Sequence, residues 1–177
     1  MALRAALKAV SQRQPREMPA KLGTRRVLVV LPPGEEAMRS AWRFLRRLTI
    51  GRDHLTPVVL AEGVAYVPDA WVGAVIAIGE KERDWRGLPR PAVAQALWGQ
   101  RPAVALSLVP AFELGAAYLV GASPAALRIG FHTPEAEPFF DLLFAAPQGL
   151  EGGLTALTHY LAALDPPVLP FVEPERR

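Results

Sequence analysis

Residues 101–131 constrain the fold of this chain more than any other stretch. Two apolar segments, 103–109 and 126–131, predict buried strands, and the apolar segment 111–120 between them predicts a short helix that ends at Gly121. Two strands that a helix joins over so few residues form a βαβ unit, whose strands run parallel and whose sheet is covered by helices. The stretch therefore predicts an α/β fold.

The rest of the chain continues this alternation of strands and helices. Apolar runs predict strands, and stretches with apolar residues at helical spacing predict helices. The further strands are expected at 26–31, 57–61, 74–78 and 141–145, and the further helices at 2–13, 35–48, 91–98 and 151–164. Residues 64–73 are interpreted mostly as turn. The sequence thus predicts a three-layer, Rossmann-like α/β domain, in which a mostly parallel sheet of five to six strands has the order 3-2-1-4-5.

Proline positions divide the chain into three parts. Pro15 and Pro19 end the first helix and begin a linker, so residues 1–24 are expected to form a basic N-terminal helix and linker. Residues 25–164 are expected to form a single α/β domain, which is long enough for one hydrophobic core. Residues 165–177 contain four prolines and predict an extended tail.

Basic residues are concentrated in the N-terminal segment. Residues 1–26 carry seven basic residues and one acidic residue, a net +6, so the remainder of this +3 chain sums to −3. We expect the helix at 2–13 to pack its Leu3, Leu7 and Val10 face on the domain or on a second copy. An acidic membrane surface and nucleic acid are the alternative partners. The apolar face is narrow and lacks Trp and Phe, which disfavours membrane insertion. The basic residues are not interleaved with aromatic ones as in RNA-binding modules.

The composition excludes several kinds of chemistry. The chain has no cysteine, which rules out disulfides, thiolate zinc sites and cysteine nucleophiles. No apolar run reaches the ~20 residues of a membrane helix, and the first residues lack the order of a signal peptide. We therefore expect a cytoplasmic protein without a membrane span. Eighteen prolines and many Arg, Ala, Leu and Val residues fit a thermophilic or high-GC bacterial source.

The expected strand order places a ligand crevice at one edge of the sheet. Open α/β sheets bind ligands at the carboxyl ends of the strands, where the strand order reverses, so residues 32–36 should face residues 109–113. The candidate ligand-binding residues are Gly34, Glu36, Phe112, Glu113 and His132. Glu35 and Glu36 are candidates for a general base or for a contact to a sugar hydroxyl. The alternative is that both are first-turn acids, which the helix dipole favours.

A row of arginines forms a second candidate site. Arg39, Arg43, Arg46, Arg47 and Arg52 give a basic face that binds phosphate or nucleic acid, or else a solvated face with internal pairs such as Glu35 and Arg39. No histidine has a partner at metal-ligand spacing, and no serine stands in a nucleophile elbow. We therefore expect no metal and no cofactor.

Two tryptophans and two glycines have structural as well as functional interpretations. Trp85 and Trp98 either cover a ligand or partner, or lie at the edge of the core. Gly121 is expected to end a helix, and Gly130 is expected to allow a close approach of another segment to the backbone.

Two stretches carry a resemblance to a known enzyme family. The first is 27–48, where a strand leads through a turn and an acidic residue into a helix. The second contains Ala-Val-Ala-Leu-Ser-Leu at 103–108, Val-Gly-Ala at 120–122 and Leu-Arg-Ile-Gly-Phe at 127–131. Both resemble the N-terminal half of family 9 glycosyltransferases, the heptosyltransferase type.

The chain also resembles a small bacterial α/β domain family of unknown function over residues 1–164. This resemblance rests on Trp85-Arg86-Gly87, on Arg128-Ile129-Gly130 and on the last helix, which contains Tyr160 and Leu161. It implies a lone α/β domain that follows a basic N-terminal helix.

The glycosyltransferase resemblance implies the fold but not the reaction. Those enzymes hold the sugar nucleotide mainly on a second domain, for which 177 residues leave no room, and their glycine-rich first turn is Pro32-Pro33-Gly34 here. Proline lacks the N–H that could hold a phosphate. We therefore expect a non-catalytic binding or interaction protein, whose partner is a second copy or another protein. The alternatives are a glycosyltransferase-like or sugar-nucleotide-related enzyme that needs a partner chain, and nucleic-acid association through the basic N-terminus.

Overall fold

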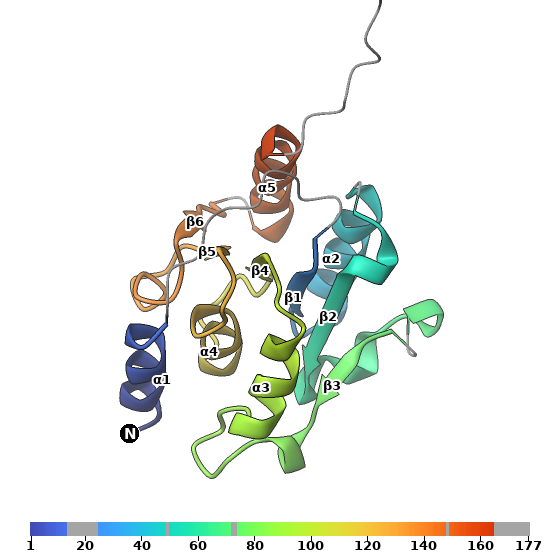
Figure 1. The fold of residues 1–177 in the computed structure, drawn as a ribbon. Coiled ribbons are helices and arrows are strands. Elements are labelled where there is room, and N and C mark those ends of the chain that lie inside the picture. Colours follow the sequence, from blue (N-terminus) through green and yellow to red (C-terminus); the bar gives the residue numbers. More distant parts are fainter. Residues whose placement is uncertain (14–24, 49, 72–73, 148, 165–177) are drawn as a thin grey trace, which may run out of the picture.

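Six parallel strands form the centre of the molecule (Figure 1). The computed structural model describes residues 1–13, 25–48, 50–71, 74–147 and 149–164. The strands are β1 (Val27–Leu31), β2 (Leu55–Leu60), β3 (Ile76–Ile78), β4 (Val104–Ser107), β5 (Leu127–Phe131) and β6 (Leu142–Phe144). Their order is β3-β2-β1-β4-β5-β6, and every neighbouring pair is parallel. The α/β class and the order 3-2-1-4-5 predicted from the sequence are confirmed, and β6 adds a sixth strand at one edge.

Helices cover both faces of this sheet. They are α1 (Ala2–Ser11), α2 (Glu35–Arg47), α3 (Pro91–Gly99), α4 (Leu114–Gly121) and α5 (Leu150–Leu164). Short 3-10 helices occupy Arg52–His54 (η1), Ala61–Tyr66 (η2), Asp69–Trp71 (η3) and Glu80–Glu82 (η4). Helices α2 and α5 pack on one face, α3 and α4 pack on the other, and α1 lies outside α4. Among the described residues, no helix has the length and apolar character needed to cross a membrane.

Strand β1 shows why the central apolar runs are continuous. Val27, Val29 and Leu31 point into the core under α2 and α5, whereas Leu28 and Val30 point into the core under α3 and α4. Successive side chains of a strand face opposite sides of a sheet, so a strand covered on both sides needs apolar residues at every position. This pattern identifies the central strands without any alternation of polar residues.

Two glycines let the segment between β5 and β6 pack closely on the sheet. A Cβ at Gly121 would lie 2.9 Å from the carbonyl oxygen of Phe139, and a Cβ at Gly130 would lie 2.7 Å from the ring of Phe140. Gly121 is also the last residue of α4. The predicted roles of these glycines, a helix end and a close approach, are confirmed.

Helix α1 packs on the domain, with a face rotated from the predicted one. Its buried residues are Ala6 and Val10, which join a cluster with Ala117 of α4 and Phe139. Leu3, which the sequence placed on the packing face, is 46% exposed. The prediction for Leu3 was wrong because the small side chains of Ala6 and Ala117 make the closer contact, which turns Leu3 toward solvent.

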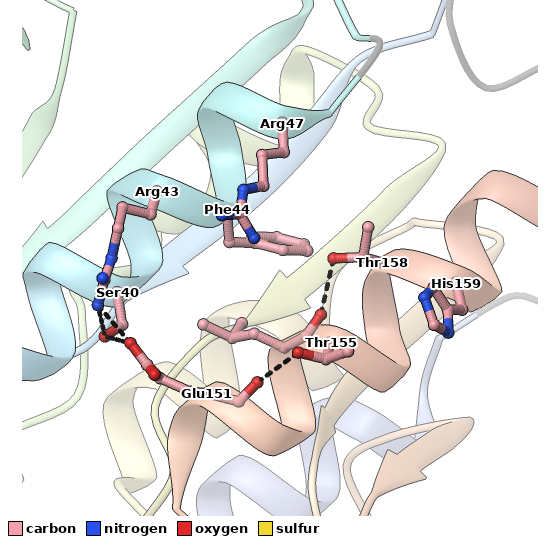
Figure 2. A pocket seen from close by; sticks show the side chains of 9 residues that line it. Ser40, Arg43, Phe44, Arg47, Glu151, Thr155, Thr158 and His159 are labelled. Carbon is pink, nitrogen blue, oxygen red and sulfur yellow. Dashed lines mark hydrogen bonds and ion pairs between the residues drawn. The ribbon is translucent and has the colours of Figure 1, made fainter.

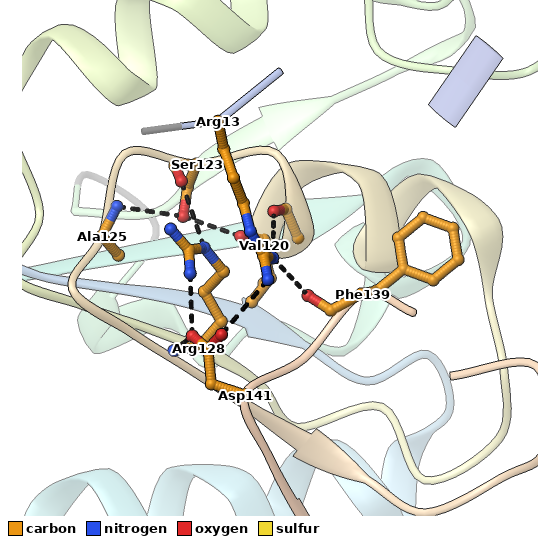
Figure 3. A network of polar contacts seen from close by, with 8 residues as sticks. Arg13, Val120, Ser123, Ala125, Arg128, Phe139 and Asp141 are labelled. Atoms are coloured by element: carbon orange, nitrogen blue, oxygen red, sulfur yellow. Dashed lines mark hydrogen bonds and ion pairs between the residues drawn. The ribbon is translucent and has the colours of Figure 1, made fainter. Parts of the chain in front are cut away.

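A buried arginine network holds the end of α1 against β5 and β6 (Figure 3). Arg13 donates to the carbonyl of Gly121 at 3.0 Å and pairs with Asp141 at 3.2 Å. The other oxygen of Asp141 pairs with Arg128 at 2.8 Å and accepts the Arg128 backbone N–H at 2.9 Å. The side chain of Arg128 is only 4% exposed, and its Nε donates to the carbonyl of Ser123. The network therefore joins α1, α4, β5 and the start of β6.

Candidate functional site

A small cavity lies at the carboxyl ends of β4 and β5, on the 109–113 side of the predicted crevice. The cavity there, beside Ser107 and Phe131 at the strand ends, has a volume of about 10 Å³, which is enough for about one water molecule. Phe112 and Phe140 line it, and Phe112 packs against Phe139 with ring centroids 5.9 Å apart. This cavity is too small for a substrate.

Glu113 uses its carboxylate within the fold. It is the N-cap of α4, and its two oxygens accept the backbone N–H groups of Gly115 at 3.0 Å and of Ala116 at 2.5 Å. The first N–H groups of a helix have no partner within the helix, so a capping carboxylate stabilises it. This predicted ligand-binding residue therefore serves α4 directly.

The other predicted site residues lie apart from this cavity. Glu35 is exposed in the first turn of α2 and pairs with Arg39 at 2.6 Å, and Glu36 is exposed beside it. Gly34 precedes them with φ +90°, a conformation that suits glycine. His132 is exposed, 3.7 Å from the carboxylate of Glu137.

The directions of the two strand-to-strand connections explain this separation. Helix α2 connects β1 to β2, whereas α4 connects β4 to β5 on the other side of the switch point. Right-handed connections in opposite directions place their helices on opposite faces of the sheet. Glu35 accordingly lines a groove with Trp42 and Trp71 on the α2 face, while Glu113 lies at the opposite face. The structure does not bring the two glutamates into one cavity.

A charge pair ties the carboxyl ends of β2 and β3 together. Both guanidinium nitrogens of Arg83 donate to the carboxylate of Glu62, at 3.0 and 2.9 Å. The hydrogen bond from Arg83 holds the pKa of Glu62 below its usual value, and the same bond raises the pKa of Arg83. The pair therefore balances one positive and one negative charge at this part of the edge.

The two tryptophans singled out from the sequence have different surroundings. Trp98 donates its indole N–H to the carbonyl of Leu119 at 2.9 Å and packs on Tyr118, so it lies at the edge of the core. Trp85 is 80% exposed. Of the two, only Trp85 leaves its ring available to a partner.

A hydrogen-bonded turn fixes the position of Trp85. Asp84 accepts the backbone N–H groups of Arg86 at 2.8 Å and of Leu88 at 3.2 Å, and it pairs with the Arg86 guanidinium. The backbone N–H of Gly87, at φ +79°, donates to the carbonyl of Asp84. Leu88 is buried against α1 and α4. The exposed ring is therefore carried by an ordered turn that is anchored in the core.

The turn and α1 enclose a shallow groove of about 680 Å³, which we name the α1–Trp85 face. It is lined by Met1, Arg4, Ala5, Leu7, Lys8 and Ser11 of the α1 region and by Trp85 and Arg86 of the turn. Three of the five large apolar side chains most exposed among the described residues, Met1, Leu3 and Trp85, lie on or beside it. Sequence reasoning identified α1 and Trp85 separately, but the turn that joins them depends on tertiary contacts.

Among the residues that the structure describes, no group of three or more His, Asp or Glu side chains lies close enough together to hold a metal ion. Comparison with protein-family models, with curated proteins and with solved structures found no match to this chain. What the structure establishes is an α/β domain with an all-parallel, Rossmann-like sheet of six strands.

Proposed function

We propose that this chain is a non-catalytic interaction protein that holds an acidic amphipathic helix of a partner protein on its α1–Trp85 face. The observation that carries the proposal is Trp85, a residue that is 80% exposed on an anchored turn, with the Arg86 guanidinium 5.4 Å from the centre of its ring. Burying such a ring releases on the order of 4 kcal/mol before the entropic cost of association. Exposed tryptophans on rigid supports are typical binding anchors.

The charge of the groove selects the chemistry of the partner. Arg4 and Lys8 are exposed along α1, and Arg86 faces them from the turn. Arg86 is paired with Asp84, so Arg4 and Lys8 supply the net positive charge. Glutamate and aspartate at the rim of a bound helix would pair with these cations and speed its association.

The shape of the groove favours a helix over a membrane surface. Residues 1, 4, 5, 8 and 11 follow helical spacing along α1, a length of about 15 Å that matches three turns of a second helix. The turn at Trp85 forms the opposite wall. A shallow groove of this length fits the apolar face of a bound helix, whereas a bilayer meets a protruding apolar surface.

The sheet edge supports a function without catalysis. Its cavity holds about 10 Å³, Glu113 is occupied by α4, and two prolines follow β1 where a phosphate-binding turn would need N–H donors. We infer that the scaffold is of the kind found in the first half of family 9 glycosyltransferases. The continuous parallel order through β1 and β4 supports that inference, and the small size of the cavity at the ends of β4 and β5 supports loss of the reaction.

A pair of designed peptides tests the proposal. The first is an amphipathic helix of about 15 residues with leucine on one face and glutamate on the other, and the second has lysine in place of glutamate. Fluorescence anisotropy of the labelled peptides measures binding to the full chain. We expect the acidic peptide to bind and Trp85→Ala to weaken it at least about tenfold, since a buried aromatic anchor is lost. We expect Arg4→Glu to weaken it several-fold.

Two variants away from the groove serve as matched controls. Tyr66→Ala removes another exposed aromatic ring, and Arg46→Glu makes the same charge change on α2; both should bind the acidic peptide within about twofold of the parent chain. Equal binding of the two peptides, or binding that Trp85→Ala leaves unchanged, contradicts the proposal. Self-association or binding to phosphatidylglycerol vesicles that depends on Trp85, without peptide binding, would replace the partner helix with a second copy or a membrane.

A further inference from the structure

Another cavity lies between α2 and α5, on the face of the sheet opposite α1 and α4 (Figure 2). Its volume is about 230 Å³. Helix α2 contributes Ser40, Arg43, Phe44 and Arg47, and α5 contributes Glu151, Leu154, Thr155, Thr158 and His159. Where the two helices meet, Ser40 of α2 lies beside Glu151 of α5. The cavity is smaller than the roughly 300–1,000 Å³ typical of drug-sized ligands.

Most hydroxyl protons in this cavity are already used. Ser40 donates to the Glu151 carboxylate at 3.1 Å. Thr155 and Thr158 donate to the backbone carbonyls one turn before them on α5, at 3.0 and 2.8 Å. The donors left for a ligand are therefore the guanidinium groups of Arg43 and Arg47 and the imidazole of His159.

The two arginines differ in their present partners. Arg43 pairs with Glu151 and also donates to Ser40 at 3.1 Å. Arg47 makes no ion pair within the part of the chain that the structure describes, and its side chain extends beside the ring of Phe44 (Figure 2). With two guanidinium groups and one carboxylate, the lining has a formal charge of +1 before any contribution from His159.

We propose that this cavity binds the phosphate group of a small molecule. Two guanidinium groups offer N–H donors in a planar arrangement that matches the oxygens of a phosphate. Phe44 and Leu154, both buried, supply an apolar wall for a short carbon chain beside the phosphate. The small volume suits inorganic phosphate or a compact phosphate monoester.

The carboxylate of Glu151 would compete with a bound phosphate for the same hydrogen-bond donors. This carboxylate occupies Ser40 and one edge of Arg43, the groups that a phosphate would also use. Glu151 is an exposed residue in the first turn of α5, so it can swing into solvent when an anion arrives. Removal of its charge should therefore raise phosphate affinity rather than abolish it.

Calorimetric titration of the full chain with inorganic phosphate and with glycerol 3-phosphate tests this inference, with chloride at equal ionic strength as the blank. We expect saturable binding that Arg47→Gln weakens about tenfold or more, because a charge-assisted contact is lost. Glu151→Gln should strengthen binding about tenfold. Tighter binding of glycerol 3-phosphate than of inorganic phosphate would identify the organic phosphate as the ligand, and the reverse would identify the free ion.

The neighbouring arginine provides a matched control. Arg46 lies next to Arg47 on α2 but lines the groove near Trp42 instead, so Arg46→Gln makes the same charge change outside the cavity. It should leave affinity within about twofold of the parent chain. Equal weakening by the two substitutions would show general electrostatic attraction and overturn the proposal, as would the absence of saturable binding at millimolar phosphate or weaker binding by Glu151→Gln. This test is independent of the peptide test, because neither ligand uses the other's residues.

Discussion

Asp84 holds the turn that exposes Trp85 at the surface. Its carboxylate accepts two backbone N–H groups and pairs with Arg86, which fixes the turn beneath Trp85. Burial raises the pKa of Asp84, but the hydrogen bonds from Arg86 and from the backbone of Arg86 and Leu88 outweigh it, so the pKa lies below its usual value of 3.8. The folded turn therefore favours the ionised carboxylate.

This depressed pKa predicts how the stability of the fold depends on pH. A group with a lower pKa in the folded state contributes stability that is present above its unfolded pKa and lost as pH falls through the folded value. We expect Asp84→Asn to lower the free energy of unfolding by about 1–3 kcal/mol at pH 7, and the difference from the parent chain to narrow below about pH 4. Urea denaturation at pH 7, 5 and 3 measures both effects.

Asp53→Asn is the control for this substitution, because Asp53 is exposed in η1. It should change stability by less than about 0.5 kcal/mol at each pH. A constant difference between Asp84→Asn and the parent chain down to pH 3 would contradict the assigned role of the carboxylate.

At the scale of elements, the attachment of α1 depends on side chains far apart in the sequence. The apolar contact of Ala6 and Val10 with α4 holds the middle of the helix, and Arg13 holds its end to Gly121 and Asp141. Burial lowers the pKa of Arg128, and the nearby Asp141 opposes that effect. Asp141 thus serves two cations, one at the end of α1 and one inside the domain.

The two roles of Asp141 predict unequal effects of substitution. Asp141→Asn leaves the buried Arg128 without its countercharge and should cost about 3–5 kcal/mol of stability. Arg13→Gln removes only the partly exposed partner and should cost about 1 kcal/mol. Chemical denaturation measures the costs, and hydrogen exchange should be faster in α1 of Arg13→Gln with β5 unchanged. Equal costs, or unchanged exchange in α1, would show that Arg13 does not anchor the helix.

Local patterns predicted the elements themselves with few errors. Apolar runs identified the strands of the sheet, and most clearly the central ones, since strands covered on both faces need apolar residues throughout. The helix expected at 111–120 begins at Leu114 instead, because Glu113 is extended and caps it. The prediction for Leu3 was wrong because the sequence of α1 does not show whether the face with Leu3 or the neighbouring face with Ala6 packs on another helix.

At the scale of the whole molecule, topology could be predicted but the site could not. The order of strands follows from apolar runs joined by right-handed connections. The meeting of distant side chains does not: Arg13 and Asp141 are 128 positions apart, and Arg43 and Glu151 are 108 apart. At the ends of β4 and β5, Phe112 and Phe140 line a cavity of about 10 Å³, and no short pattern specifies how such aromatic residues pack.

The small cavity at the ends of β4 and β5 predicts that sugar nucleotides do not stabilise the chain. A ligand with a Kd of about 100 μM, supplied at about 10 mM, would add ~2.7 kcal/mol and raise Tm by more than about 5 °C. We expect no such shift with UDP-glucose or GDP-mannose by thermal denaturation. The same measurement is made on the Arg47→Gln variant, which lacks the proposed phosphate site between α2 and α5, so that binding at that site is not counted as binding at the sheet edge. A shift of this size in both samples would restore the glycosyltransferase-like alternative.

The two outer strands, β3 and β6, have only three residues each. A long exposed edge offers unpaired N–H and carbonyl groups to any passing chain and promotes aggregation, and short edge strands suppress that pairing. Because these edge strands are short, they offer other copies of the chain few unpaired backbone groups with which to extend the sheet into a fibre. The helical faces and the Trp85 turn are therefore the more available surfaces for assembly, and their side chains can discriminate one partner from another as bare backbone cannot.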